Sequence, residues 1–246
     1  MTRPAVFSVD RLDLAFAPAP WLFAQQRRAE IDAYFAELQR EKPAIWNGRV
    51  LVLRRHELRD GVFHGAYLET DYASFSAWRH WQPTDAGVHD CFGAGAVISA
   101  DGAVLLGVMG AHTANAGWIY FPAGTPDPAD IIDGKVDLDW SVARELKEET
   151  GLDIAEVSPA PGWTTVIDGQ LIVHIKTLRS RLSAEQLRTN MLAHLATEAQ
   201  PELADIRIVH GPADYDPAMP AFVTAFLEAY FSGRLPIPES QRELRG

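Results

Sequence analysis

The residues with the clearest chemical potential lie in the run Arg144-Glu145-Leu146-Lys147-Glu148-Glu149-Thr150-Gly151-Leu152. Residues three or four apart share one face of a helix, so Glu145, Glu148 and Glu149 are predicted to cluster. Three neighbouring carboxylates repel one another unless a cation neutralises them. Mg²⁺ prefers oxygen ligands of this kind and keeps bound waters. The run therefore predicts a divalent-metal site, with Mg²⁺ as the expected ion and Mn²⁺ as the alternative.

Two further residues of this run support a built site. Arg144 precedes Glu148 by one helical turn and is expected to orient it. Gly151 is of the type that commonly ends a helix. An isolated pair of turns rich in glutamate is more often a solvated helix face, but that reading leaves the rest of the nine-residue string unexplained.

The run matches the second half of the Nudix box at every position: Arg, Glu, an aliphatic residue, any residue, Glu, Glu, any residue, Gly and an aliphatic residue. The sequence from about Phe92 to the C-terminus resembles Nudix hydrolases. The resemblance implies an enzyme that hydrolyses a nucleoside diphosphate linked to a second group X. It also implies that Glu148 and Glu149 hold the metal with help from Glu145, and that Arg144 belongs to the site.

The first half of the box departs from the family pattern, which has a glycine, five residues, a glutamate and seven residues before the Arg-Glu pair. Counting back from Arg144 places the glutamate position on Val136. The expected glycine is Gly124, which leaves the loop about six residues too long. We expect Asp137 or Asp139 to replace the missing carboxylate in part, and Asp139 to cap the helix.

Members of this family often recruit a further acidic residue from a later loop. Glu198 is our expectation for an extra metal ligand or for the general base, and Glu202 is the competing residue. An ordinary polar loop is equally compatible with this segment. Glu145 and Glu198 are the two candidates for the general base.

The substrate is less directly indicated. The run Lys42-Pro43-Ala44-Ile45-Trp46-Asn47-Gly48 and the later Leu68-Glu69-Thr70-Asp71-Tyr72 resemble the N-terminal part of eukaryotic Nudix proteins that hydrolyse UDP-glucose and UDP-galactose. This implies cleavage of a UDP-sugar to UMP and sugar 1-phosphate. The individual residues have simpler readings as a turn and a helix cap, and no substrate-binding residue is assigned. Four aromatic residues could stack on a base but are more often core: Trp81, Trp118, Tyr120 and Trp163.

Three other functions remain open. One is a Nudix hydrolase of ADP-ribose, a dinucleotide or a coenzyme A derivative. Another is a nucleotide-sensing Nudix module that binds without cleaving, although sensors commonly lose the helix carboxylates that are present here. An acidic adaptor protein would explain the charge but not the nine-residue string.

The expected partner is the small-molecule nucleoside diphosphate derivative that the resemblance implies, and charge and composition argue against two other kinds of partner. The chain has 246 residues and a formal net charge of -11 without a basic run, which argues against nucleic acid as a partner. Its one cysteine cannot form an internal disulfide. No uncharged apolar run is long enough to cross a membrane and the N-terminus is not signal-like, so we expect a soluble, cytoplasmic protein.

The pattern along the chain predicts an N-terminal α+β extension at 1–87 and a Nudix domain at 88–246. Strands and helices mix without strict alternation, which predicts an α+β or mixed α/β fold with a mixed sheet between helices. The extension is a candidate dimer surface or lid. We expect helices at about 24–41, 72–78, 139–150, 183–195 and 222–231, a linker at 82–87 and a loop at 122–134. We expect strands at 50–53, 62–68, 93–99, 103–108, 118–121 and 206–209, and two strands within 164–178 around Asp168-Gly169.

Overall fold

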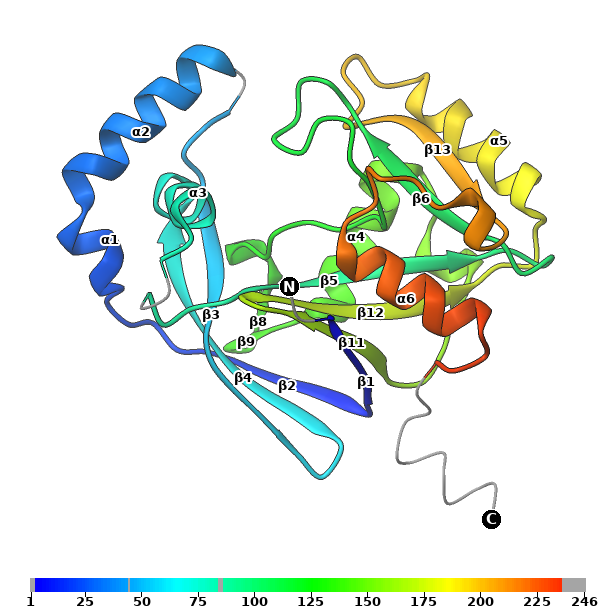
Figure 1. Cartoon of the computed structure of the whole chain (residues 1–246), viewed down its shortest axis with the longest axis horizontal. Helices are drawn as coiled ribbons and strands as arrows, with labels where there is room; N and C mark the ends of the chain where they lie inside the picture. Colours follow the sequence, from blue (N-terminus) through cyan, green and yellow to red (C-terminus); the bar gives the residue numbers. More distant parts are fainter. Residues whose placement is uncertain (1–2, 44, 84–85, 236–246) are drawn as a thin grey trace.

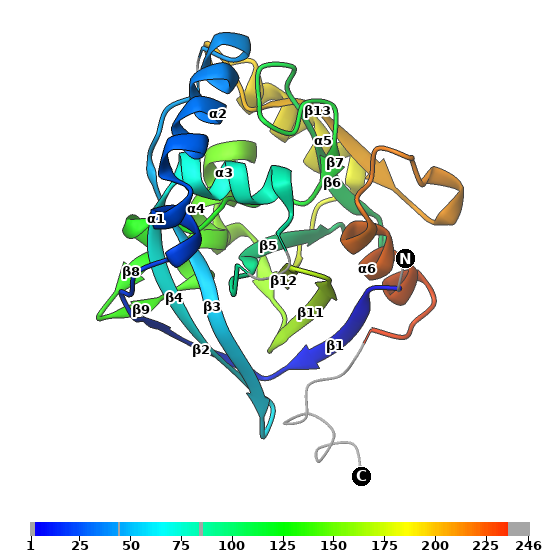
Figure 2. The same ribbon diagram turned by 60° about the vertical axis from the view of Figure 1, so that its left-hand side comes forward.

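The chain has a mixed α+β architecture, as its sequence predicts. The computed structural model describes residues 3–43, 45–83 and 86–235. These residues form two mixed sheets and six α-helices (Figures 1 and 2). None of the described helices is long and apolar enough to cross a membrane.

The larger sheet carries the strands that support the acidic helix. Its order is β1-β11-β12-β5-β6-β13, with β10 beside β12 and β7 beside β6. β5 and β12 are parallel, and the other pairs are antiparallel. The bounds are β1 Ala5–Val9, β5 Asp90–Ile98, β6 Val104–Met109, β7 Ile119–Tyr120, β10 Ser158–Pro159, β11 Trp163–Asp168, β12 Leu171–Arg179 and β13 Leu203–Val209.

The smaller sheet has the order β3-β4-β2-β9-β8. β2 is parallel to β4, and the other pairs are antiparallel. The bounds are β2 Arg11–Phe16, β3 Arg49–Arg59, β4 Val62–Asp71, β8 Ile131–Ile132 and β9 Lys135–Val136. Two strands from early in the chain therefore pair with segments far along it: β1 with β11 and β2 with β9.

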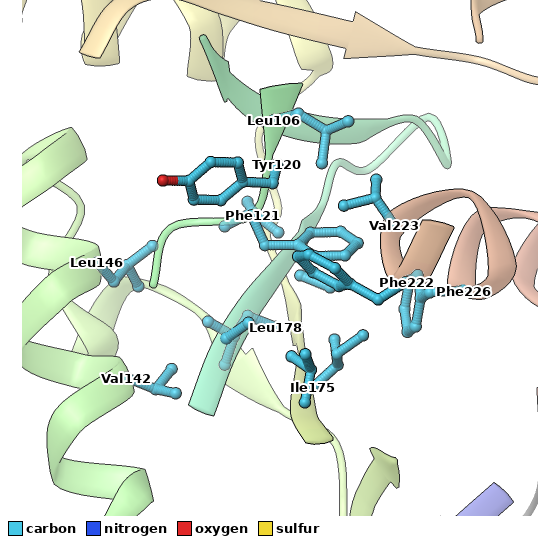
Figure 3. Packing of buried hydrophobic residues seen from close by; sticks show 14 of the residues in the cluster. Leu106, Tyr120, Phe121, Val142, Leu146, Ile175, Leu178, Phe222, Val223 and Phe226 are labelled. Atoms are coloured by element: carbon cyan, nitrogen blue, oxygen red, sulfur yellow. The ribbon is translucent and has the colours of Figure 1, made fainter. Parts of the chain in front are cut away.

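Helices cover both faces of the central strands β5 and β12. The helices are α1 Leu22–Gln26, α2 Arg28–Glu41, α3 Tyr72–Trp81, α4 Leu138–Thr150, α5 Ala184–Leu195 and α6 Ala221–Phe231. In Figure 3, Val142 and Leu146 of α4 point toward the strands from one side, and Phe222 and Phe226 of α6 point from the other. Burial on both faces explains why β5 reads as a nearly continuous apolar run rather than an alternating one.

Most predicted elements are present, and the main differences are the following. The helix expected at 24–41 is two helices that meet at Arg27. The segment expected to be a loop at 122–134 contains a 3₁₀ turn at Pro128–Asp130 and strand β8. The N-terminal strands β1 and β2 were not predicted, because their partner strands are distant in sequence.

The division at 87/88 stays a prediction. Thr84 and Asp85, in the predicted linker, lie outside the described residues, as does Ala44 of the earlier motif. Both sheets contain strands from each side of this division. Whatever its folding autonomy, the N-terminal region therefore shares hydrogen-bonded sheets with the rest of the chain.

Gly93 on β5 sets how closely α4 approaches the sheet. A Cβ atom at this position would lie 2.8 Å from Val142 Cγ2 and 3.2 Å from the Leu138 carbonyl oxygen. No real side chain fits at such distances without moving the helix. The absence of a side chain at Gly93 therefore seats α4 directly on β5.

We predict that Gly93→Ala lowers the free energy of unfolding by about 1–3 kcal/mol, since overpacking a well-packed contact has that cost. Urea unfolding followed by circular dichroism measures it. Gly211→Ala is the matched control, because nothing lies within 4 Å of a Cβ built at Gly211. Equal effects of the two substitutions would contradict this account of the helix seat.

Candidate active site

The acidic helix α4 has well-defined ends. The Asp137 carboxylate accepts a hydrogen bond of 2.9 Å from the Trp140 backbone N–H and caps the first turn. Gly151 ends the helix with a φ of 73°. The predicted helix is confirmed to within one residue at its start, but Asp139 as its cap is wrong. Asp139 lies in the first turn and pairs with Lys176 Nζ at 2.8 Å.

Arg144 joins three carboxylates. Its guanidinium lies 2.8 Å from Glu145 Oε1 and 3.2 Å from Glu148 Oε2. On its other side it donates to both oxygens of Asp130, at 3.2 and 3.3 Å. Asp130 has no exposed surface, and burial raises the pKa of its carboxyl while Arg144 opposes that rise. The buried Asp130 carboxylate therefore fixes one side of the Arg144 guanidinium, and the other side contacts Glu145 and Glu148.

Asp130 is the site residue that the sequence interpretation missed. Counted forward from Gly124, Asp130 follows five intervening residues, which is the spacing the family pattern gives for its first acidic residue. Counting back from Arg144 instead led to Val136, which is a buried core residue of β9. The extra length lies between Asp130 and α4, where it forms the β8–β9 hairpin that pairs with β2. The carboxylate is present, and the insertion follows it.

Glu145 lies against the backbone of the preceding loop. A Cβ atom at Gly124 would be 2.0 Å from Glu145 Oε1, so any other residue would displace this carboxylate from its present position. Burial raises the pKa of Glu145 to about 7, while the charge of Arg144 lowers it and that of Glu148 raises it further. Gly124 therefore shapes the site by letting the loop approach the helix.

Glu149 is the most deeply buried carboxylate on α4. Burial raises its pKa well above the ordinary value, and the charges of Glu145 and Glu202 add to the rise. One backbone hydrogen bond, from Ala123, opposes it. Glu149 Oε2 is buried and has no hydrogen-bond partner within the described part of the chain. Such an oxygen is costly to bury unless something else binds it.

Glu148, by contrast, is largely exposed. Its side chain retains 60% of its surface and contacts Arg144. The backbone carbonyl of Glu148 lies 3.1 Å from His194 Nε2 of α5. All three predicted helix carboxylates thus lie on one side of α4, at graded depths from buried Glu149 to exposed Glu148.

The two acidic residues of the later segment occupy different surroundings. Glu198 pairs with His194 Nε2 at 3.1 Å. The charge of Glu202 raises the pKa of both Glu145 and Glu149, whereas that of Glu198 acts on Glu202. Desolvation near the helix carboxylates raises the pKa of Glu202 itself, although the residue as a whole is exposed. Of the two, Glu202 is the one electrostatically coupled to the α4 carboxylates.

Three cavities that share lining residues form a cleft that reaches Gly124 and Glu202 but is not lined by the α4 carboxylates. A pocket of about 100 Å³ is lined by Gly124, Thr125 and Trp118, and a second of about 490 Å³ by Thr125, Glu202 and Trp46. A third cavity of about 960 Å³ shares Trp118 with the first and Ile45 with the second. The 110–118 segment lies opposite α2 and α3 (Figure 1), and residues of all three line the largest cavity.

Of the four aromatic residues that could stack on a base, two line the cleft and two pack against other residues of the protein. Trp118 is 48% exposed and lines two of the cavities, and Tyr120 lines the smallest one. The Tyr120 hydroxyl points away from the packed side chains (Figure 3) and accepts a hydrogen bond from Asn115 at 3.1 Å. Trp163 is buried beneath Lys176, and Trp81 packs against Arg27.

The donor set suits a hard divalent cation. It consists only of carboxylate oxygens, one of which is buried and unpaired, and their mutual repulsion is relieved by positive charge. Among the described residues, however, no group of three or more His, Cys, Asp or Glu side chains is already arranged to hold a metal ion. Glu145 and Glu148 contact Arg144 instead.

Comparison with known proteins gives low-level structural similarity only. No protein-family model and no curated protein matches the chain. Similar solved structures include a Nudix hydrolase from M. smegmatis, RenU, with 16% identity and a TM-score of 0.38 over 61% of this chain and 88% of that one. The MutT protein from Methanosarcina mazei Go1 has 18% identity and a TM-score of 0.39 over 59% and 94%. A bifunctional NMN adenylyltransferase/ADP ribose pyrophosphatase from Francisella tularensis has 14% identity and a TM-score of 0.41 over 64% and 45%.

These scores are too low to carry an argument about activity.

We predict that Asp130→Asn lowers the free energy of unfolding by about 2–3 kcal/mol. This is less than the ~3–5 kcal/mol for breaking a fully buried pair, because Arg144 keeps Glu145 and Glu148 as partners. Chemical denaturation measures the loss. Asp153→Asn removes an exposed partner of Lys147 and should change stability little. A loss no larger than that of the control would contradict the anchoring role of Asp130.

Proposed function

We propose that the protein is a divalent-cation-dependent hydrolase of the Nudix type. It cleaves the diphosphate bond of a nucleoside diphosphate linked to a second group. The observation that carries this proposal is the buried Oε2 atom of Glu149, which has no hydrogen-bond partner among the described residues and lies near other carboxylates. A binding protein without catalysis has little use for a costly group of this kind, whereas a cation between carboxylates and phosphates explains it.

Glu145, Glu148 and Glu149 are the proposed metal-holding residues, with an acidic residue of the later segment as a fourth. When bound, the cation neutralises charge on the phosphates and activates water. Arg144 acts as a positioning residue, since it contacts Glu145 and Glu148 while Asp130 fixes its other side. Gly124 allows the loop to lie close to the Glu145 carboxylate.

Hydrolysis requires that water attack one phosphorus atom while the bridging P–O bond breaks and its electrons remain on the leaving phosphate. A carboxylate must accept the proton of the water. Glu202 is our first candidate, because it lies on a different element from the helix carboxylates and lines the cleft. Glu198, paired with His194, and Glu145 remain the sequence-derived candidates for this role.

The substrate that we favour is a UDP-sugar, cleaved to UMP and sugar 1-phosphate. The cleft supports a two-ended ligand, since the pockets that meet at Thr125 each contain an exposed tryptophan, Trp118 on one side and Trp46 on the other. Two residues of the N-terminal run that resembles UDP-sugar hydrolases line these cavities, Lys42 and Trp46. Asn47 of that run accepts a hydrogen bond from Ala73 N–H, so its role is structural. ADP-ribose, dinucleotides and coenzyme A derivatives are two-ended as well and form the alternative.

The direct test is product analysis with Mg²⁺ or Mn²⁺ on UDP-glucose, UDP-galactose, ADP-ribose and NADH. We expect UMP and sugar 1-phosphate from the UDP-sugars. Cleavage of ADP-ribose alone would retain the hydrolase and remove the UDP-sugar assignment. Metal-dependent binding without turnover of any compound would replace the enzyme by a nucleotide sensor.

We predict that Glu149→Gln lowers kcat by about 10²–10⁴-fold, the range for losing one essential acid–base or charge-bearing group. Steady-state kinetics on the cleaved substrate measures it. Glu185→Gln, which changes an exposed glutamate at the start of α5, is the control and should retain full activity. A Glu149→Gln variant with near-normal kcat would refute the site.

A further inference from the structure

Asp90, at the start of β5, is a buried acidic residue that the proposed hydrolysis does not use. Its side chain keeps only 10% of its surface. The nearest cation is Arg79, whose Nε lies 3.6 Å from Asp90 Oδ2, beyond hydrogen-bond distance. Within the described residues its carboxylate accepts no hydrogen bond, although its backbone N–H donates to the Gln170 carbonyl.

Among the described residues, only Arg79 lies close enough to offset the partial desolvation of this carboxylate. Burial raises the pKa of Asp90 and Arg79 opposes the rise. Buried carboxylates in folded proteins normally accept several hydrogen bonds. A structural ion pair would be expected to close to hydrogen-bond distance, as that of Arg28 with Asp71 does at 2.7 Å. The oxygens of Asp90 are therefore free to accept hydrogen bonds from a ligand.

Asp90 faces the space where a ligand would lie. Asp90 and Arg79 both line the cavity of about 960 Å³ and the pocket of about 100 Å³ that leads to Gly124. Asn115, Trp118 and Phe222 line the same two spaces. The cavity walls thus combine a hydrogen-bond acceptor, Asp90, with two neighbouring donors, Arg79 and Asn115. The rings of Trp118 and Phe222 add aromatic surface.

The chemistry of these walls selects sugar hydroxyls. A hydroxyl both donates and accepts, so it can donate to the Asp90 carboxylate and accept from Arg79 at the same time. The apolar C–H face of a pyranose packs on an exposed aromatic ring such as Trp118. A negative carboxylate also repels phosphate, which keeps the diphosphate toward Gly124 and leaves the uncharged end of the substrate beside Asp90.

We propose that Asp90, with Arg79, binds the hydroxyl groups of the sugar in a nucleoside diphosphate sugar and sets the preference for a sugar as the second group. The inference rests on the proposed function for the position of the diphosphate. It goes beyond it by assigning a specificity residue that lies outside the nine-residue run and its neighbouring loops.

The test compares UDP-glucose with the methyl ester of UDP, which has the same nucleoside and diphosphate but no sugar. We expect Asp90→Asn to lower kcat/KM for UDP-glucose by about 10- to 100-fold, mainly by raising KM. This is the loss of affinity that removal of a hydrogen bond to a charged group usually causes. For the methyl ester we expect a change below about twofold. UDP-sugars lacking one hydroxyl at a time should lose affinity for the wild type and less for the variant, which identifies the hydroxyl bound.

Two further variants separate ligand contact from structure. Asp71→Asn removes a carboxylate that caps α3 and pairs with Arg28, and it should leave the ratio of the two substrates unchanged. Trp118→Ala alters an exposed residue of the same pocket, so it should fold even where Asp90→Asn does not. It should weaken UDP-glucose more than the methyl ester.

Equal losses on both substrates would overturn the proposal. So would a loss of activity in Asp90→Asn that occurs with UDP-glucose but not with ADP-glucose, because the two substrates share the sugar and differ only in the base. Calorimetric binding of the same two ligands separates this inference from the hydrolase itself. Tighter binding of UDP-glucose than of the methyl ester, lost in Asp90→Asn, would support the subsite even in a protein that cleaves neither. Equal affinity of the wild type for both would reject it.

Discussion

The unsatisfied carboxylate of Glu149 is the constraint on which the rest of the site depends. Burying that oxygen among other acidic groups lowers stability, and the local structure is arranged so that the helix cannot move to relieve it. Gly93 seats α4 on β5, Asp137 caps its start and Gly151 ends it. A helix free to rotate would turn Glu149 toward water, and the fixed helix instead keeps the carboxylate buried.

Arg144 and Asp130 extend this constraint to the preceding loop. Asp130 is fully buried, so its charge needs Arg144, and Arg144 in turn contacts the helix carboxylates. The β8–β9 hairpin then joins the same loop to β2 of the N-terminal region, with Lys135 paired to Asp13 at 2.8 Å. The insertion before α4 thus connects the N-terminal region mechanically to the acidic helix.

The sequence predicted those features whose physics is local. Helical spacing placed the three glutamates on one face. The helices expected at 183–195 and 72–78 are present as α5 and α3, which are capped by Ser183 with Gln186 and by Asp71. β1 and β2 were missed because their partners lie far along the chain, where no local pattern reveals them. Asp130 was missed because an insertion shifts its distance from Arg144 while leaving its distance from Gly124 intact.

No local sequence pattern could predict which residues line the cleft. Asp90, Arg79 and Trp118 come from β5, α3 and the 110–118 segment, and only the packing of α3 beside the larger sheet brings them together. Each is unremarkable alone, since acidic, basic and aromatic residues are common at the edges of elements. The decisive fact is that the Asp90 carboxylate is nearly buried and accepts no hydrogen bond from the described residues, which depends on every neighbour in space. The proposed sugar preference depends on tertiary structure, whereas the spacing of the three glutamates needs only one helix.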